Sequence, residues 1–311
     1  MKILFPKSSL LLIVLSLFNI AASSQDFPST VLATINNYGP QAAQSLLKQY
    51  RDSRGITPEY LEAYSWLGRY ALVNRDYATA EKLAQQTYDM CVDQLKLRPV
   101  DAEPHLPTAL GAAIEVRGQA LAAEGHRAAA KSYLLAEEKK YGTTSIADRI
   151  QKNVNLITLE GSLAPPLQET EFLGPKPKPL TAYRGKPVIL FFWAHWCADC
   201  KAEAPILARL KSEFGDRLAI VGPTQRYGYA AAGNPASPSA ELKYIDDVRA
   251  RYYSSLSEMP VPVSNANFRR YGASTTPTIV IVGADGKVKL YHPGRMTYEE
   301  LRQALANAGL S

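Results

Sequence analysis

The chain has 311 residues, of which 46% are hydrophobic and 21% are charged, and it contains 19 Gly and 21 Pro. These proportions are ordinary for a globular protein, and they exclude a collagenous or wholly disordered chain. The length favours two domains, while three cysteines are too few for a disulfide-rich scaffold. The net charge of +6 falls to +4 without Lys2 and Lys7, and the sequence has no run of five basic residues. We therefore expect no nucleic-acid partner.

The first residues have the order of a secretory signal peptide. Lys2 and Lys7 precede an apolar stretch at 10–20, and four small residues follow at 21–24. The apolar stretch is shorter than the about 20 residues of a membrane span. We therefore expect residues 1–24 to be cleaved and the mature chain to be exported, to the periplasm. An uncleaved membrane anchor is the alternative.

The next part of the chain, from about residue 30 to 141, is rich in helix-forming residues and carries helix boundary signals. Thr57 followed by Pro58 is typical of a helix start, Pro104 and Pro107 open a later helix, and Gly125 ends it. We expect helical hairpins that form an all-α domain over 25–155. The predicted helices cover residues 58–74, 77–97, 104–124 and 127–141.

Parts of this helical domain resemble tetratricopeptide repeats. Ala80 and Ala130 occupy similar positions in two stretches of this pattern, but they lie 50 residues apart where the repeat period is about 34. A generic helical bundle that supports the second domain and a groove for a protein partner both stay open. The residues nearest the pattern are Leu67, Gly68, Tyr77, Ala80 and Leu83 in the first stretch, and Gly125, Ala130 and Leu134 in the second.

A proline-rich connector at 161–185 separates the helices from a region in which strands and helices alternate. This alternation predicts an α/β domain over 156–311. In chain order we expect a buried strand at 187–193, a helix at 199–214, a strand at 218–221, a helix opened by Ser237-Pro238, a strand at 278–282, a hairpin turn at Asp285-Gly286, a strand at 287–291 and a final helix capped by Thr297 and Glu300.

Two cysteines, Cys197 and Cys200, lie between the buried strand and the first helix of this domain. A thiol at a helix N-terminus faces unpaired N–H groups that stabilise its thiolate, so Cys197 is the expected nucleophile and Cys200 the resolving thiol. A zinc ribbon would need a second pair of ligands, and haem attachment would need His where this chain has Lys201. A structural disulfide that closes so short a loop would constrain little chain entropy.

Residues 191–205, FFWAHWCADCKAEAP, resemble the active-site segment of the thioredoxin superfamily, in its exported TlpA/ResA-like branch. The likeness extends over about 161–311 and includes Arg184-Gly185-Lys186, Pro205 and the segment from Tyr271-Gly272 to Thr276-Pro277-Thr278. It implies a thioredoxin-like fold and a protein-disulfide oxidoreductase. The redox group would be the Cys197-Cys200 disulfide, with no cofactor or metal, and the partners would be disulfide-containing proteins and a membrane electron donor.

The resemblance also implies roles for residues around the cysteines. Pro277 would be a cis-proline facing the cysteine pair, and Thr276 would offer backbone groups to an extended substrate peptide. The alternative is an ordinary trans proline at a strand start. Trp193 and Trp196 resemble the family's packing and active-site tryptophans, although either could be a simple core or surface aromatic.

The sequence departs from the family pattern at two places near the cysteines. Many relatives have an acidic residue six positions before the first cysteine, where this chain has Phe191, so we expect that proton relay to be absent. Asp199 instead supplies a carboxylate inside the loop, and like-charge repulsion predicts that it raises the pKa of Cys197 and makes the pair more reducing. His195 either opposes this effect when protonated or is an exposed loop histidine without a role.

Two further features do not belong to this motif. Cys91 recurs at helical spacing with Leu83, Thr87 and Leu95, which predicts a buried core residue, although a third redox partner is the alternative. The irregular segment 224–239 contains Arg226, Tyr227 and Tyr229. It either shapes a substrate surface or is a plain insertion. In the first case, Arg226, Tyr227 and Tyr229 would shape that surface.

The sequence therefore predicts an exported reductase of protein disulfides. Oxidation of substrate dithiols is the alternative within the same class. A scaffold whose helices bind a partner, with an ancillary redox domain, is the alternative from another class. A thiol peroxidase is disfavoured because the peroxiredoxin pattern would need Pro and Thr where this chain has Leu190 and Ala194.

Overall fold

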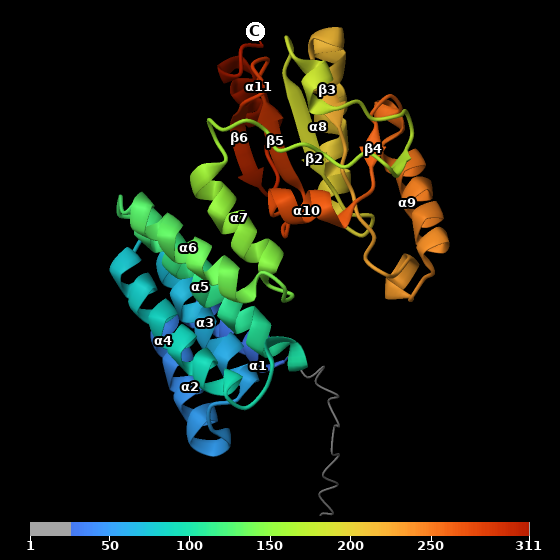
Figure 1. The fold of residues 1–311 in the computed structure, drawn as a ribbon. Helices are drawn as coiled ribbons and strands as arrows, with labels where there is room; N and C mark the ends of the chain where they lie inside the picture. Colours follow the sequence, from blue (N-terminus) through green and yellow to red (C-terminus); the bar gives the residue numbers. More distant parts are fainter. Residues whose placement is uncertain (1–25, 311) are drawn as a thin grey trace, which may run out of the picture.

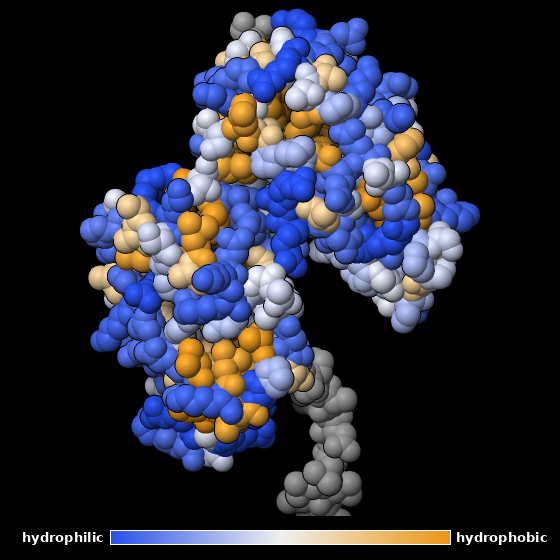
Figure 2. All heavy atoms as spheres, in the orientation of Figure 1, coloured by the Kyte–Doolittle hydropathy of each residue, from blue (hydrophilic) through white to orange (hydrophobic). Residues whose placement is uncertain are grey.

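A computed structural model of the protein describes residues 26–310, so the expected signal peptide at 1–24 lies outside the described residues. Figure 1 shows two parts, a bundle of helices followed by an α/β part that contains the C-terminus. Within 26–310, no helix combines the length and the apolar character needed to cross a bilayer. On the face shown in Figure 2, apolar residues gather in separate patches with hydrophilic residues between them.

The first part is all-helical and has two layers. Helices α1, α3, α5 and α7 pack side by side, while α2, α4 and α6 each pack against two of them. The predicted helices are confirmed as α3 to α6, and Thr57 caps α3 by accepting the Tyr60 N–H at 3.1 Å. The helices are α1 (Phe27–Tyr38), α2 (Pro40–Arg54), α3 (Pro58–Val73), α4 (Tyr77–Leu95), α5 (His105–Ala123), α6 (Arg127–Tyr141) and α7 (Ala147–Thr158).

Cys91 is a core residue of this helical part, as predicted. It lies on α4, has no exposed surface and is not in a disulfide. Burial raises the pKa of its thiol to about 12. Very little thiolate therefore exists at neutral pH, and Cys91 has the character of an inert core thiol.

The second part is built on a four-stranded sheet with the order β3-β2-β5-β6. Strand β2 (Val188–Phe192) is parallel to β3 (Ala219–Val221) and antiparallel to β5 (Thr278–Val282), which is antiparallel to β6 (Val288–Pro293). All five residues of β2 are buried, which explains the continuous apolar run in the sequence.

Helices cover both faces of this sheet (Figure 1). Ile189 and Phe191 of β2 share a core with α8 (Ala198–Phe214), α9 (Pro238–Tyr252) and α11 (Tyr298–Asn307). Alternate β2 residues, including Leu190 and Phe192, face the other core, to which α10 (Asn265–Tyr271) contributes Phe268 and Tyr271. The strands and helices predicted for this part are confirmed, including the capping box at the start of α11.

The sequence patterns do not predict three short elements of this part. Strand β1 (Phe172–Leu173) pairs with β4 (Val261–Pro262) in a separate two-stranded sheet, and α10 has only seven residues. Elements this short carry no measurable hydrophobic period. Apart from β1 and a 3-10 helix at Leu180–Tyr183, the proline-rich connector that precedes β2 is irregular, as predicted.

Helix α7 joins the two parts and packs against α10. It ends at Thr158, three residues beyond the expected boundary at 155. Gly272 has φ +57°, and a Cβ there would lie 2.3 Å from the Lys152 backbone nitrogen, so only glycine allows this approach. Arg269 also forms an ion pair with Asp148 of α7. The helical part is thus fixed against the face of the α/β part opposite α8.

Candidate active site

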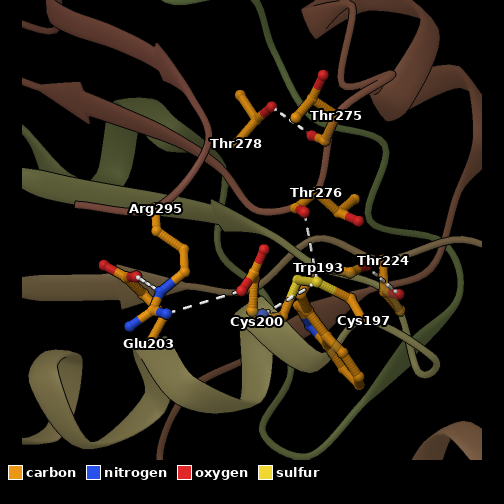
Figure 3. The surroundings of a disulfide bond; sticks show 10 residues. Trp193, Cys197, Cys200, Glu203, Thr224, Thr275, Thr276, Thr278 and Arg295 are labelled. Atoms are coloured by element: carbon orange, nitrogen blue, oxygen red, sulfur yellow. Dashed lines mark hydrogen bonds and ion pairs between the residues drawn. A yellow bond between two sulfur atoms is a disulfide. The ribbon is translucent and has the colours of Figure 1, made fainter. Parts of the chain in front are cut away.

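The redox centre is a disulfide between Cys197 and Cys200 at the N-terminus of α8 (Figure 3). Cys197 is the N-cap residue of this helix, and its sulfur accepts the Cys200 backbone N–H at 3.0 Å. Cys197 is 3% exposed and Cys200 is fully buried. An N–H donor and the positive end of the helix dipole therefore act on the more exposed sulfur, where they stabilise a thiolate.

The segment before β5 faces this disulfide. The Thr276-Pro277 peptide bond is cis, as the resemblance implied. The Thr276 carbonyl oxygen lies 3.4 Å from the Cys197 sulfur (Figure 3). The backbone is held by Thr278, whose hydroxyl donates to the Thr275 carbonyl at 2.6 Å. Binding of a substrate peptide at Thr276 stays a prediction.

The two tryptophans of the motif lie in different surroundings. Trp193 is buried, and its indole N–H donates to the Gly222 carbonyl at 2.9 Å while its own carbonyl accepts from the Thr224 hydroxyl at 2.8 Å. Trp196, directly before Cys197, is 49% exposed. Trp193 therefore fixes the strand end, whereas Trp196 offers an apolar surface beside the disulfide.

A basic residue that sequence analysis missed faces the cysteine loop. Arg295 follows β6, and its Nη1 lies 3.7 Å from Asp199 Oδ1. Its Nε lies 3.8 Å from Oε2 of Glu203, one turn after Cys200 on α8. The positive charge opposes the effect that we expect Asp199 to have on Cys197. No sequence pattern joins these residues, because they come from segments far apart in the chain.

Glu203 is a buried acid in this site, and it too was missed. Its side chain has no exposed surface, and neither oxygen accepts a well-formed hydrogen bond from the described residues. Burial raises its pKa to about 7, against the lowering effects of the Met296 backbone N–H and Arg295. Phe191 does leave the usual acidic position empty, but the site still has a buried carboxylate on the helix that carries Cys200.

The expectation of an exposed His195 is wrong, because aromatic side chains enclose it. His195 is 1% exposed and its ring lies 5.3–5.5 Å from the rings of Tyr227, Tyr229 and Tyr244. Its Nε2 lies 3.4 Å from Glu241 Oε1 on α9. Burial lowers the pKa of His195, partly offset by Glu241. The imidazole is therefore neutral at pH 7 and does not oppose the charge of Asp199.

The segment 224–239 lies against this side of the site. Glu241 accepts the backbone N–H groups of Tyr227 and Gly228, the latter at 2.9 Å. Arg226 pairs with Glu171 through a hydrogen bond of 2.7 Å, and the Tyr227 ring lies 5.6 Å from the Trp196 ring. The segment is thus anchored beside Trp196, and its role as a substrate surface stays a prediction.

Comparison with known proteins places this geometry in a family. Residues 181–309 match the family described as a thioredoxin-like domain. The chain is 30% identical over 152 residues to the thioredoxin-like protein YneN of Bacillus subtilis (strain 168), a match that covers 47% of this chain and 78% of that protein. It is also 30% identical over 146 residues to the thiol-disulfide oxidoreductase ResA of Geobacillus thermodenitrificans (strain NG80-2), covering 47% and 75%.

Among solved structures, the exposed lipoprotein thioredoxin of Streptococcus pneumoniae strain TIGR4 is 27% identical, with a TM-score of 0.36 over 45% of this chain and 98% of that one. The matched residues 181–309 include the Cys197-Cys200 disulfide at the start of α8. The chain therefore belongs to the thioredoxin superfamily and is a thioredoxin-type thiol-disulfide oxidoreductase.

Proposed function

We propose that the protein is an exported reductase of protein disulfides, with Cys197 as the nucleophile and Cys200 as the resolving thiol. One observation carries this assignment: the Cys197 sulfur caps α8, accepts the Cys200 N–H and is the more exposed of the two. The nucleophile needs both a stabilised thiolate and access to substrate, whereas the resolving thiol needs only proximity.

The reaction starts from the reduced dithiol. The Cys197 thiolate attacks one sulfur of a substrate disulfide, which breaks the substrate S–S bond and forms a mixed disulfide. The substrate's other sulfur leaves as a thiolate and takes up a proton. Cys200, after losing its proton, attacks the Cys197 sulfur and releases the second substrate thiol. Two electrons pass to the substrate, and the enzyme ends with the Cys197-Cys200 disulfide.

Substrate binding is proposed for the surface around the Cys197 sulfur. In support, the Thr276 carbonyl oxygen lies 3.4 Å from this sulfur, and an extended peptide would pair with the Thr276 backbone as an added strand. Trp196 offers exposed aromatic area next to the same sulfur. Asp199, in the loop between the cysteines, adjusts the charge near the nucleophile.

Glu203 is the proposed acceptor of the Cys200 proton. Both side chains are fully buried, and they lie three residues apart on α8, which places them on neighbouring positions of one helix face. With a pKa of about 7, Glu203 can take up and release a proton near neutral pH.

Each turnover consumes two electrons, so the oxidised enzyme needs a reducing partner. We propose a membrane electron donor that acts on the Cys197-Cys200 disulfide from outside the cytoplasm, with residues 1–24 as the export signal. Sequencing the N-terminus of the mature protein from a periplasmic fraction tests export. Oxidation of substrate dithiols, with electrons flowing in the opposite direction, remains the alternative.

Trapping tests the roles of the two cysteines. In Cys200→Ser the mixed disulfide cannot be resolved, so we expect substrates to remain attached to Cys197 until a thiol reagent releases them. The matched control is Cys197→Ser, which should trap none of these partners. If neither variant, or both equally, retained partners, the assignment of nucleophile and resolving thiol would be wrong.

A further inference from the structure

Arg295 places a positive charge between two carboxylates of the redox centre. Its guanidinium lies 3.7 Å from Asp199 and 3.8 Å from Glu203. The two carboxylates differ in surroundings, since the Asp199 side chain is 64% exposed and that of Glu203 is fully buried. Figure 3 shows the Arg295 side chain extended toward Glu203 on the side of the disulfide away from Thr224. One cation therefore acts on an exposed and a buried acid together.

The backbone of this segment is fixed to the active site. The Gly294 N–H donates to the Pro277 carbonyl at 2.8 Å, which joins the end of β6 to the cis-proline segment. The Arg295 carbonyl lies 3.1 Å from Nε2 of His292. Arg295 thus extends from a backbone that is held relative to the disulfide, and its reach toward Glu203 does not depend on a free loop.

The charge of Glu203 is decided by opposing neighbours. Burial, Asp199 and Glu300 of α11 favour the protonated form, whereas Arg295 and the Met296 backbone N–H favour the ionised form. Among the charged side chains of the described part of the chain that act on Glu203, Arg295 is the cation that offsets the two acids. Its value as a stabilising ion pair is small, because it is half exposed and its contacts are long.

We infer that Arg295 is a positioning residue for the thiol chemistry, which keeps Glu203, one turn after Cys200 on α8, partly ionised so that this carboxylate can accept the Cys200 proton. The inference rests on the proposed function, since it takes Cys200 as the resolving thiol. Without Arg295, burial and the two acids favour the protonated form of Glu203 more strongly, so less carboxylate is available at neutral pH to take up the Cys200 proton. Reduction of substrate would then require a higher pH.

The first test is a titration of Glu203 in the oxidised protein, followed by carbon NMR of side-chain carboxyl groups, with Glu203→Gln to identify the signal. The disulfide removes the ionisation of Cys197 and Cys200 from the measurement. Arg295→Gln should move the Glu203 midpoint upward by about one pH unit, whereas Arg295→Lys, which keeps the charge, should stay near wild type. Asp199→Asn should move the midpoint downward. An unchanged midpoint in Arg295→Gln would overturn the inference.

The second test is the pH dependence of kcat/KM for reduction of a protein disulfide. In Arg295→Gln the acidic limb of the kcat/KM profile should shift to higher pH by the same interval as the Glu203 titration midpoint. This shift lowers kcat/KM about tenfold near pH 6 and leaves it close to the wild-type value near pH 9. Arg295→Lys should restore the wild-type profile. A uniform loss at every pH would contradict the inference, because it would indicate a merely structural role.

The two tests separate the inference from the function on which it rests. The titration needs no turnover, so it decides whether Arg295 controls Glu203. A wild-type protein that reduced no disulfide would overturn the proposed function even with the expected midpoints. A wild-type protein that was active while its Arg295→Gln variant kept the wild-type midpoint would overturn only the role of Arg295.

Discussion

Two buried glutamates flank the active-site loop, and their surroundings are opposite. Glu241 on α9 accepts two backbone N–H groups from the segment 224–239 and faces His195. Glu203 on α8 accepts no well-formed hydrogen bond from residues 26–310, and burial raises its pKa to about 7. Both are at most 1% exposed. The same residue type at the same depth is thus satisfied on one side and left unsatisfied on the other.

The difference between Glu241 and Glu203 shows that burial of a carboxylate alone does not indicate a role in proton transfer. A carboxylate that accepts backbone N–H groups stabilises the segment that donates them, and removing it leaves donors unpaired. A carboxylate without such partners destabilises the folded protein when it is ionised, and its proton can leave or bind near neutral pH. Glu241 therefore has the character of a structural anchor, and Glu203 that of a proton acceptor.

The sharpest test of this comparison is Glu241→Ala. We expect it to lower the free energy of unfolding by about 3 kcal/mol, because the N–H groups of Tyr227 and Gly228 lose their acceptor. Urea denaturation measures this change. Glu203→Gln under the same conditions is the matched control and should not destabilise the protein. Equal losses in the two variants would remove the distinction between the two glutamates.

Glu203→Gln should change how stability depends on pH. The folded pKa of about 7 lies above the ordinary value of 4.5, so the folded state holds a proton that the unfolded state has already released. The contribution of Glu203 to the free energy of unfolding is fully present below pH 4.5 and is lost as the pH rises to about 7. The loss amounts to roughly 2–3 kcal/mol.

The measurement is the free energy of unfolding of the oxidised protein at a series of pH values. Glu203→Gln lacks the titrating group, so its advantage over wild type should grow from about pH 4.5 to pH 7 and then level off. A difference that stayed constant over this interval would contradict the raised pKa. It would also remove the reason for treating Glu203 as a proton acceptor.

His195 should give a pH dependence of the opposite sign, with a smaller effect. Burial lowers its pKa in the folded state, so the unfolded state binds a proton at a higher pH than the folded state does. Stability from His195 is therefore present above its ordinary pKa and is lost as the pH falls below it. His195→Gln should reduce this loss on acidification, as measured by urea denaturation between neutral and mildly acidic pH. A loss as steep as in wild type would show that other groups cause it.

The same contrast explains which features could be predicted from the sequence. The helix start at Thr57, the box formed by Thr297 with Glu300, and the position of Cys197 between a strand and a helix are local patterns, and the structure confirms each one. Local signals fix these features because the interacting residues lie within a few positions of one another.

The surroundings of the disulfide could not be predicted in this way. The burial of His195 requires tyrosines from the segment 224–239 and from α9, and the charge around Glu203 requires Arg295 from beyond β6. These contacts form only when the sheet brings distant segments together. Glu203 could still have been noticed, since it lies three residues after Cys200 on the inward face of α8.

The smallest expected effect concerns Asp199, the exposed acid beside the two buried ones. Asp199→Asn should lower the pKa of Cys197 and make the pair less reducing, because a negative charge near the thiolate is removed. Solvent and Arg295 screen that charge, so the change should be less than about half a pKa unit. The rate of Cys197 alkylation as a function of pH measures it.

The control for Asp199 is the same substitution in an Arg295→Gln background. With the neighbouring cation gone, removal of the Asp199 charge should lower the pKa of Cys197 further than it does in the wild-type background. An unchanged or raised pKa of Cys197 in Asp199→Asn would show that this exposed acid does not act on the nucleophile. Charge control at the redox centre would then belong to the pair of the half-exposed Arg295 and the buried Glu203 alone.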